Sequence, residues 1–171
     1  MLEIFWFFVI SLFFLTFSVP LIFFKGAPFM PTQQKDLEKI LDYFGDGGGK
    51  KFIDLGSGDG RAVIEFAKNN FESYGIEINP FLVILSKMKI KKLKIKNAKI
   101  FWGSFWKMNL NKFDVVYFFH YQGSNKSLEL RLQQDLKNDA VIISYAFPLK
   151  TFGLVKKVNS AFLYKKIPLL N

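Results

Sequence analysis

The sequence predicts an α/β protein with a mostly parallel sheet, preceded by one membrane-spanning helix. Two observations carry this prediction. From Lys50 onward, short apolar stretches typical of strands alternate with stretches typical of helices, and such alternation favours a parallel sheet that is covered on both faces. Before this region, residues 4–24 form a run of 21 residues without a charged side chain.

The run at residues 4–24 has the length of a transmembrane helix. At about 1.5 Å of rise per residue it spans roughly 31 Å, close to the hydrocarbon thickness of a bilayer. A cleaved signal peptide would need a basic stretch before the run and a small-residue cleavage site, but Glu3 precedes the run and Leu-Ile-Phe-Phe ends it. A buried core helix is the other alternative. We expect an uncleaved anchor that contacts the lipid bilayer through residues 4–24.

Charge predicts the orientation of this anchor. Of the 14 acidic residues only Glu3 precedes the run, and all 24 Lys and Arg follow it. The positive-inside rule therefore places the folded domain in the cytoplasm. The chain has no Cys and one His, which excludes a disulfide scaffold, a Cys-ligated zinc site and a metalloprotease helix with two His. We expect a single-pass membrane protein without a metal.

Three segments are expected: the anchor at residues 1–24, a linker and helix at residues 25–49, and the α/β domain at residues 50–171. In the linker, Thr32 is placed to cap the following helix. The apolar residues of that helix repeat with a helical period: Leu37, Ile40, Leu41 and Phe44.

Five strands and a terminal hairpin are predicted within the domain. The strands are KKFIDLG (50–56), SYGIEIN (73–79), AKIFWG (98–103), FDVVYFFHY (113–121) and AVIISYAFPL (140–149). The helices between them are RAVIEFAKN (61–69), NPFLVILSKMKIKKLKIKN (79–97) and SLELRLQQDL (127–136). The hairpin pairs residues 151–158 with residues 161–167 around Asn159-Ser160.

Residues 54–61, DLGSGDGR, form the clearest functional motif, because they follow a predicted strand and open a helix. Gly56 and Gly58 let the backbone turn tightly and approach a ligand. Ligands of open α/β sheets bind at the carboxyl ends of the strands. Glu77 ends the next strand, 17 residues after Gly60, where a carboxylate can accept hydrogen bonds from both hydroxyls of a ribose.

This loop fits neither a dinucleotide site nor a phosphate-binding loop. A dinucleotide fingerprint needs G-x-G-x-x-G, but Arg61 stands in place of the third Gly, and no G-x-x-x-x-G-K-[ST] is present. Asp54 and Asp59 make the loop a poor site for pyrophosphate and a good one for a cationic ligand. S-adenosylmethionine, with a ribose, an ammonium and a sulfonium group, suits these residues. The alternative is a Gly-rich turn with ordinary surface acids.

On these residues the chain resembles the seven-strand, class I S-adenosylmethionine-dependent methyltransferases over roughly residues 50–166. The resemblance implies one Rossmann-like domain with a mostly parallel seven-strand sheet and an antiparallel last strand, which suits the terminal hairpin. It also implies that Asp54, Gly56 and Gly58 line the methionine end of the cofactor and that Glu77 holds the ribose.

Further cofactor-binding candidates lie beside these residues. Asp59 belongs to the loop, and Asn79 with Pro80 shapes the turn beside the ribose. The family usually has an acid after the third strand, to meet the adenine amine. Here that place holds Gly-Ser-Phe-Trp, so Ser104 and Phe105 become the candidates for the adenine contact.

A narrower resemblance rests on P-F-M-P-T at residues 28–32, on Asp54–Arg61 and on Glu77–Pro80. With the apolar segment in front of them, these motifs are similar to the lysine methyltransferases of the ATP synthase c-subunit and ADP/ATP carrier family and their prokaryotic relatives. The resemblance implies a membrane-anchored protein-lysine N-methyltransferase with a protein substrate at or near the membrane. A methyltransferase for a small molecule, lipid or RNA stays an alternative, as does a non-catalytic, membrane-tethered S-adenosylmethionine-binding protein.

His120 and Tyr121 are the catalytic candidates, because they follow the fourth strand at the expected rim of the site. A lysine nucleophile must lose its proton, and His120 is the only His of the chain, with an ordinary pKa of about 6.5. Tyr121 could orient the amine. The alternatives are a structural hydrogen bond for His120 and aromatic packing for Tyr121.

One stretch is crowded with lysines: Lys87, Lys89, Lys91, Lys92, Lys94, Lys96 and Lys99. One interpretation is a solvated helix face, with Met88, Ile90, Leu93 and Ile95 packed inward. Another is attraction to anionic lipid, since each basic residue near such a surface adds roughly 1 kcal/mol. Nucleic-acid binding is the least expected, because no RNA-binding module accompanies the stretch.

Overall fold

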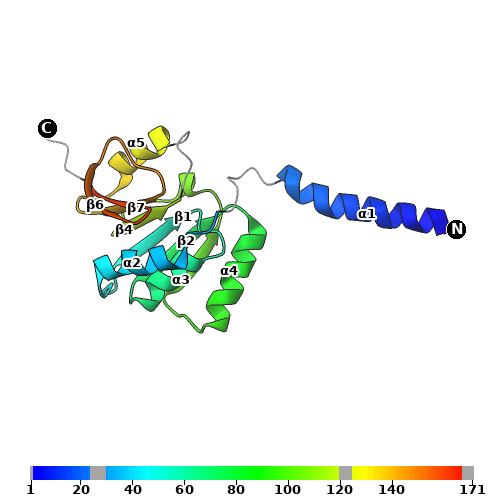
Figure 1. The fold of residues 1–171 in the computed structure, drawn as a ribbon, viewed down its shortest axis with the longest axis horizontal. Helices are drawn as coiled ribbons and strands as arrows, with labels where there is room; N and C mark the ends of the chain where they lie inside the picture. Colours follow the sequence, from blue (N-terminus) through cyan, green and yellow to red (C-terminus); the bar gives the residue numbers. More distant parts are fainter. Residues whose placement is uncertain (1, 24–29, 120–124, 167–171) are drawn as a thin grey trace.

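Figure 1 shows the computed structural model of the chain. The structure describes residues 2–23, 30–119 and 125–166, with side chains in the first segment only as far as residue 13. An N-terminal helix and an α/β domain make up this described part.

Helix α1 runs from Leu2 to Phe23, and its large apolar side chains are exposed wherever they are described. Figure 1 draws α1 apart from the α/β domain. Within the part of the chain whose side chains the structure describes, no helix is both long and apolar enough to cross a membrane. The predicted anchor at residues 4–24 is therefore not confirmed and stays a prediction.

The domain is built on one seven-stranded sheet in the order β3-β2-β1-β4-β5-β7-β6. The strands are β1 (Lys51–Leu55), β2 (Glu72–Glu77), β3 (Ala98–Trp102), β4 (Val115–Phe118), β5 (Val141–Tyr145), β6 (Gly153–Val158) and β7 (Ala161–Lys165). Pairs within the first five strands are parallel, whereas β7 is antiparallel to both β5 and β6. The predicted α/β class, its parallel strands and the terminal hairpin are confirmed.

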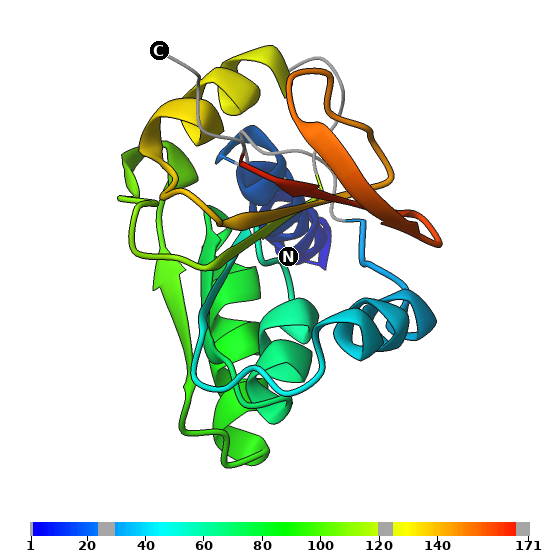
Figure 2. The same cartoon turned by 90° about the vertical axis from the view of Figure 1, so that its left-hand side faces the viewer.

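Helices cover both faces of the sheet. They are α2 (Gln34–Phe44), α3 (Arg61–Lys68), α4 (Pro80–Lys92), the 3-10 turn η1 (Phe105–Lys107) and α5 (Asn125–Asp135). One hydrophobic core contains buried side chains of α2, α3 and α4, and the other contains those of α5. The turned view of Figure 2 shows α2 and α5 on opposite sides of the strands.

Alternation along the central strands explains the two cores. In β1, Phe52 enters the core under α2 to α4, and Ile53 enters the core under α5. In β4, Tyr117 enters the core under α2 to α4, and Val116 enters the core under α5. Successive strand residues point to opposite faces, so a continuously apolar strand is buried on both sides.

Helix α2 is part of the packed domain. Its side chains of Leu37 and Ile40 are fully buried in the first core. The buried carboxylate of Asp36 accepts hydrogen bonds from the Tyr145 hydroxyl at 2.6 Å and from Asn159 at 2.8 Å. These bonds fasten α2 to strand β5 and to the β6–β7 turn.

The structure corrects the prediction for the lysine-rich helix. The expected helix at residues 79–97 ends earlier, because α4 ends at Lys92 and Lys94 adopts a left-handed φ of 54°. Ile90 is buried as one interpretation required, but Met88 and Leu93 are exposed rather than packed inward. The positions that face inward with Ile90 are Val83 and Ser86.

Candidate active site

The candidate site lies where strands β1, β2 and β4 end at the carboxyl edge of the sheet. In the parallel register, Asp54 of β1 lies beside Gly75 of β2 and Tyr117 of β4. Glu77 is the last residue of β2, one strand away from Asp54. The two acids predicted from the sequence therefore converge on one edge.

The glycine loop after β1 turns back over the end of β2. The backbone N–H groups of Gly56 and Ser57 donate to the Ile76 carbonyl at 2.9 and 3.1 Å. Gly56 has a φ of 105° and Gly58 a φ of 52°, conformations that side chains with a Cβ rarely adopt. A Cβ on Gly56 would meet nothing within 4 Å. This side of the loop is open enough for a ligand to approach the backbone.

A second glycine, Gly75, lets this loop lie close to the sheet. A Cβ on Gly75 would lie 2.6 Å from the Ser57 Cβ and 2.8 Å from the Ile100 Cδ1. The Ser57 hydroxyl is buried there and has no hydrogen-bond partner within the described residues. The sequence alone does not single out Gly75, because a lone Gly inside a strand does not reveal which backbone will approach it.

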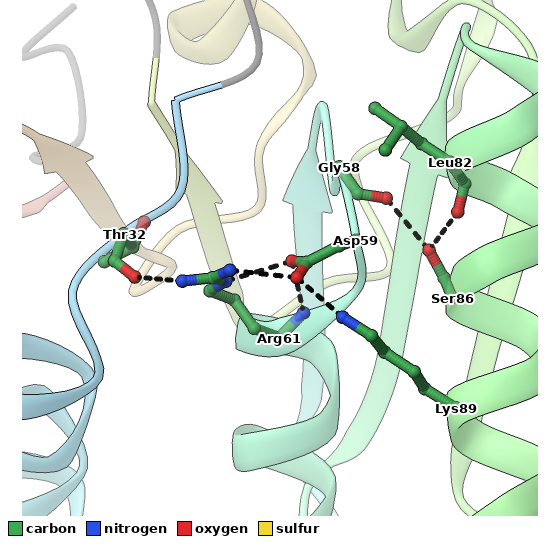
Figure 3. A network of polar contacts seen from close by, with 7 residues as sticks. All are labelled: Thr32, Gly58, Asp59, Arg61, Leu82, Ser86 and Lys89. Carbon is green, nitrogen blue, oxygen red and sulfur yellow. Dashed lines mark hydrogen bonds and ion pairs between the residues drawn. The ribbon is translucent and has the colours of Figure 1, made fainter.

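Helix α4 is fastened to the same loop. The Ser86 hydroxyl donates to the Gly58 carbonyl at 2.9 Å, and its Cβ lies 2.9 Å from where a Cβ on Gly60 would be. Figure 3 shows Ser86 between Gly58 and Leu82, whose carbonyl is its second acceptor. Gly60 is therefore needed for the close approach of α4 as well as for its own φ of 79°.

Backbone amides hold the Glu77 carboxylate in place. Its Oε2 accepts from the Gly58 N–H at 2.9 Å, and its Oε1 accepts from the Asn79 N–H at 2.8 Å. Each carboxylate oxygen has capacity for a further hydrogen bond, so Glu77 can still accept from a ligand hydroxyl. The Asn79 side chain itself caps α4, because its Oδ1 accepts from the N–H groups of Phe81 and Leu82.

Asp54 differs from Glu77 in lacking such support. It is buried, and no hydrogen bond to its carboxylate is found within the described residues. Burial, with the negative charges of Glu77 and Asp59 nearby, raises the pKa of Asp54 well above its usual range. A cation placed beside this carboxylate would relieve both effects.

Asp59 is already paired with two cations of the chain (Figure 3). Its carboxylate accepts from the Arg61 guanidinium at 2.9 and 3.0 Å and from the Lys89 ammonium at 2.7 Å. Burial alone would raise the pKa of Asp59, but the hydrogen bonds and charges of Arg61 and Lys89 outweigh it and lower the pKa to about 2. In this arrangement Asp59 links the glycine loop to α4.

The segment before α2 reaches into the site through Thr32. Its hydroxyl forms a 2.5 Å hydrogen bond with the Tyr117 hydroxyl, and its carbonyl accepts from Arg61 at 3.0 Å. Thr32 and Tyr117 are both buried. The prediction that Thr32 caps the helix is wrong, because Gln33 occupies that position and makes no side-chain cap.

Burial, followed by the charge of Asp54, raises the pKa of Tyr117 well above its usual range.

The segment after β3 lies next to Glu77. The Gly103 N–H donates to the Glu77 carbonyl at 2.9 Å, and Ser104 precedes the 3-10 turn that begins at Phe105. Arg131 of α5 holds this turn by donating to the Phe105 carbonyl at 2.7 Å. In the strand order β3-β2-β1, Ser104 and Phe105 follow the strand that lies on the far side of Glu77 from Asp54. Their roles stay predictions.

His120 and Tyr121 lie outside the described residues. The described part of β4 ends at Phe118, at the same sheet edge as Asp54. The catalytic roles of His120 and Tyr121 therefore stay predictions.

Comparison with known proteins settles the family. Residues 54–156 match the ANTKMT methyltransferase domain. The chain belongs to this family. The matched region begins at Asp54 and includes the glycine loop, Glu77, and strands β2 to β5. The predicted methyltransferase class and the narrower resemblance are thereby confirmed.

Relatives of this family extend from archaea to animals. The chain is 33% identical to the human lysine N-methyltransferase of the ATP synthase c-subunit, over 71% of this chain and 52% of that protein. It is 29% identical to a protein-lysine N-methyltransferase of Saccharolobus islandicus, over 72% of this chain and 79% of that one. The chain thus spans about half the length of its human relative.

The fold is shared with solved methyltransferase structures. An RNA methyltransferase from Salinibacter ruber, in complex with S-adenosyl-L-homocysteine, superimposes with a TM-score of 0.77 at 22% identity, covering 83% of this chain and 97% of that chain. At this identity the likeness shows the fold, and it confirms the Rossmann-like arrangement predicted from the sequence.

Proposed function

We propose that the chain is an S-adenosylmethionine-dependent protein-lysine N-methyltransferase. The family match and the names of the relatives support the reaction. The observation that carries the proposal is the pair of acids at the glycine loop: Asp54, buried and without a hydrogen-bonded partner within the described residues, and Glu77, held by two backbone amides.

These residues fit S-adenosylmethionine. The Asp54 carboxylate suits the cationic methionine end, since a positive charge there would stabilise its ionised form. Glu77 has acceptor capacity for the ribose hydroxyls, and the open side of Gly56 leaves room beside the loop. We assign the adenine contact to Ser104 and Phe105. Held by Asp54 and Glu77, the cofactor would supply a methyl group bonded to a positively charged sulfur, which would leave as a neutral thioether when a lysine nitrogen takes the methyl group.

The chain itself has to position the lysine and accept its proton. Holding the amine in line with the methyl group supplies much of the rate enhancement, because positioning lowers the entropic cost of reaction. We assign proton acceptance to a ring nitrogen of His120 and orientation of the amine to Tyr121. These two residues follow strand β4, whose described part ends at the sheet edge that carries Asp54.

We further propose that residues 4–24 anchor the chain in a bilayer, with the catalytic domain in the cytoplasm. The uncharged run and the excess of Lys and Arg after it support this proposal. So do the exposed apolar side chains along the described part of α1. An anchored enzyme would meet membrane-bound protein substrates at a raised effective concentration. Extraction of membranes with alkaline carbonate should leave the full chain in the membrane fraction. Release of the chain into the soluble fraction would disprove the anchor.

Transfer of a labelled methyl group tests the reaction. The full chain, in detergent or vesicles, is incubated with methyl-labelled S-adenosylmethionine and a membrane extract, and the labelled product is identified by mass spectrometry. We expect methyl-lysine in a membrane protein with the wild-type chain and a much weaker signal with Asp54→Asn. Label in lipid, RNA or a small molecule would contradict the lysine assignment. Cofactor binding without any transfer would identify a non-catalytic binding protein.

A further inference from the structure

Helix α4 is apolar on two opposite faces, of which only one is covered. Val83, Ser86 and Ile90 recur at helical spacing and are buried against the domain. On the other side, Ile84, Leu85 and Met88 also share one face, since residues one turn apart lie together on a helix. Their side chains are 56, 41 and 65% exposed. In Figure 1, α4 forms the outer edge of the domain.

Lysines flank this exposed face and extend it toward the end of the helix. Residues 80–100 contain seven lysines and no acidic residue. Lys89 is used by Asp59, but Lys87, Lys91 and Lys92 are exposed, and no ion pair to them is found within the described residues. The outward face therefore combines an apolar patch with lysines that have no ion-pair partner among the described residues.

We propose that this outward face of α4, the docking face, rests on the surface of an anionic bilayer. Ile84, Leu85 and Met88 would enter the headgroup region, and the three lysines would pair with lipid phosphates. Amphipathic helices bind membranes through this combination of buried apolar area and attraction to anionic lipid. Phe81, which is 62% exposed, extends the same apolar face by one turn. A contiguous exposed apolar face beside basic side chains favours a lipid surface, because such a face inserts into the headgroup region.

The docking face is linked to the active site through α4 itself. The helix begins one residue after Asn79, whose backbone N–H holds Glu77, and its Lys89 and Ser86 hold Asp59 and Gly58. A bilayer against the outward face would therefore lie alongside the cofactor-binding edge. This inference rests on the membrane location in the proposed function and adds a second, reversible contact to the proposed anchor.

The Cys-free sequence allows one environment-sensitive fluorophore to be placed on the full chain. Met88→Cys carries the probe on the docking face, and Ile84→Cys provides a second position there. Val155→Cys, which is 49% exposed on strand β6, is the matched control. Each labelled chain is reconstituted into vesicles of phosphatidylcholine, alone or mixed with phosphatidylserine, with and without nitroxide-labelled lipid.

We expect blue-shifted emission and nitroxide quenching for the probes at 84 and 88 in the vesicles with phosphatidylserine, and neither at 155. Each of Lys87→Gln, Lys91→Gln and Lys92→Gln should lower the ratio of docked to undocked chain about fivefold. A water-like probe on α4 in the anionic vesicles would overturn the proposal. So would equal quenching at 155, or a response that requires added membrane protein.

Two further measurements on the same vesicles separate this proposal from the function proposed above. Methyl transfer to a membrane extract reports the reaction, and resistance to carbonate reports the anchor. Quenched probes without methyl transfer would disprove the proposed reaction and support the docking face. Methyl transfer with a water-like probe on α4 would support the reaction and disprove the docking face.

Discussion

Asp54 and Asp59 stand on either side of the same glycine loop, yet their environments are opposite. Asp59 is held by Arg61 and Lys89, and its pKa is lowered to about 2. Asp54 is buried near two other acids without a cation, and its pKa is raised well above the usual range. One carboxylate has its countercharge within the chain, whereas the other has none among the described residues.

The comparison separates two roles that look alike in the sequence. Removing one partner of a buried charge pair destabilises the fold, because the other charge is left without compensation. A buried charge that has no partner in the fold costs stability unless a ligand supplies the partner. We therefore infer that Asp59 holds the loop to α4 and that Asp54 receives the cationic part of the cofactor. Strongly shifted pKa values of the Asp54 kind are common where a site prepares for its ligand.

The largest expected effect is on cofactor affinity at Asp54. Asp54→Asn removes a charged acceptor, whose hydrogen bonds to a ligand are worth about 1.5–3 kcal/mol, so the affinity for S-adenosylmethionine should fall about tenfold to a hundredfold. Titration calorimetry on the full chain measures this affinity. The matched control is Asp42→Asn on the exposed side of α2, which should bind as wild type. Unchanged affinity in folded Asp54→Asn would refute the division of roles.

The same substitution should raise the stability of the unliganded chain. A carboxyl group whose folded pKa is raised lowers the stability of the fold as the pH rises above its unfolded pKa of about 3.9, because the unfolded state then releases the proton that the folded state retains. The loss of stability is complete once the pH exceeds the folded pKa. Asp54→Asn cannot ionise, so its thermal midpoint at neutral pH should exceed that of wild type. A lower midpoint would show that Asp54 has a stabilising partner.

Substitution of Asp59 should change the stability of the unliganded chain in the opposite direction, because Asp59→Asn should lower it. The folded pKa of Asp59, about 2, lies below its unfolded value of about 3.9, and this difference corresponds to about 2–3 kcal/mol of stability at neutral pH. The side chains of Arg61 and Lys89 are each more than a third exposed, so solvent screening should reduce this to about 1–2 kcal/mol. Urea unfolding of Asp59→Asn measures the loss.

The pH dependence of this difference provides the control. The stabilisation by Asp59 is fully present above pH of about 4 and should disappear as the pH falls toward about 2. Wild type and Asp59→Asn should therefore converge in stability over that interval. A constant difference would mean that Asp59 stabilises the loop by its shape and not by its charge.

The sequence predicted the elements of the fold well because their patterns are local. The apolar strands around Ile53 and Val116, the start of α4 at Asn79-Pro80 and the turn at Asn159 each depend on neighbouring residues. The placement of Glu77 beside the loop also followed, because parallel strands end at a common edge.

What the sequence could not provide were contacts between distant segments. Thr32 and Tyr117 are 85 positions apart, and Thr32 has the appearance of a helix cap until the sheet is assembled. Asp59 could not be distinguished from Asp54 for the same reason, since its partner Lys89 belongs to a helix across the loop. The exposure of Met88 depends on which face of α4 meets the sheet, and both faces are apolar.

The smallest expected effect is the coupling energy between Thr32 and Tyr117, through which the pre-domain segment meets the site. Thr32→Val and Tyr117→Phe each remove one hydroxyl and leave a buried partner unsatisfied, which costs about 1–3 kcal/mol. The double variant leaves neither unsatisfied, so its loss should be smaller than the sum of the single losses by about 1 kcal/mol. Urea unfolding of the four proteins in this cycle measures the coupling. Strictly additive losses would show that the Thr32 carbonyl, through Arg61, holds the segment without help from the hydroxyl pair.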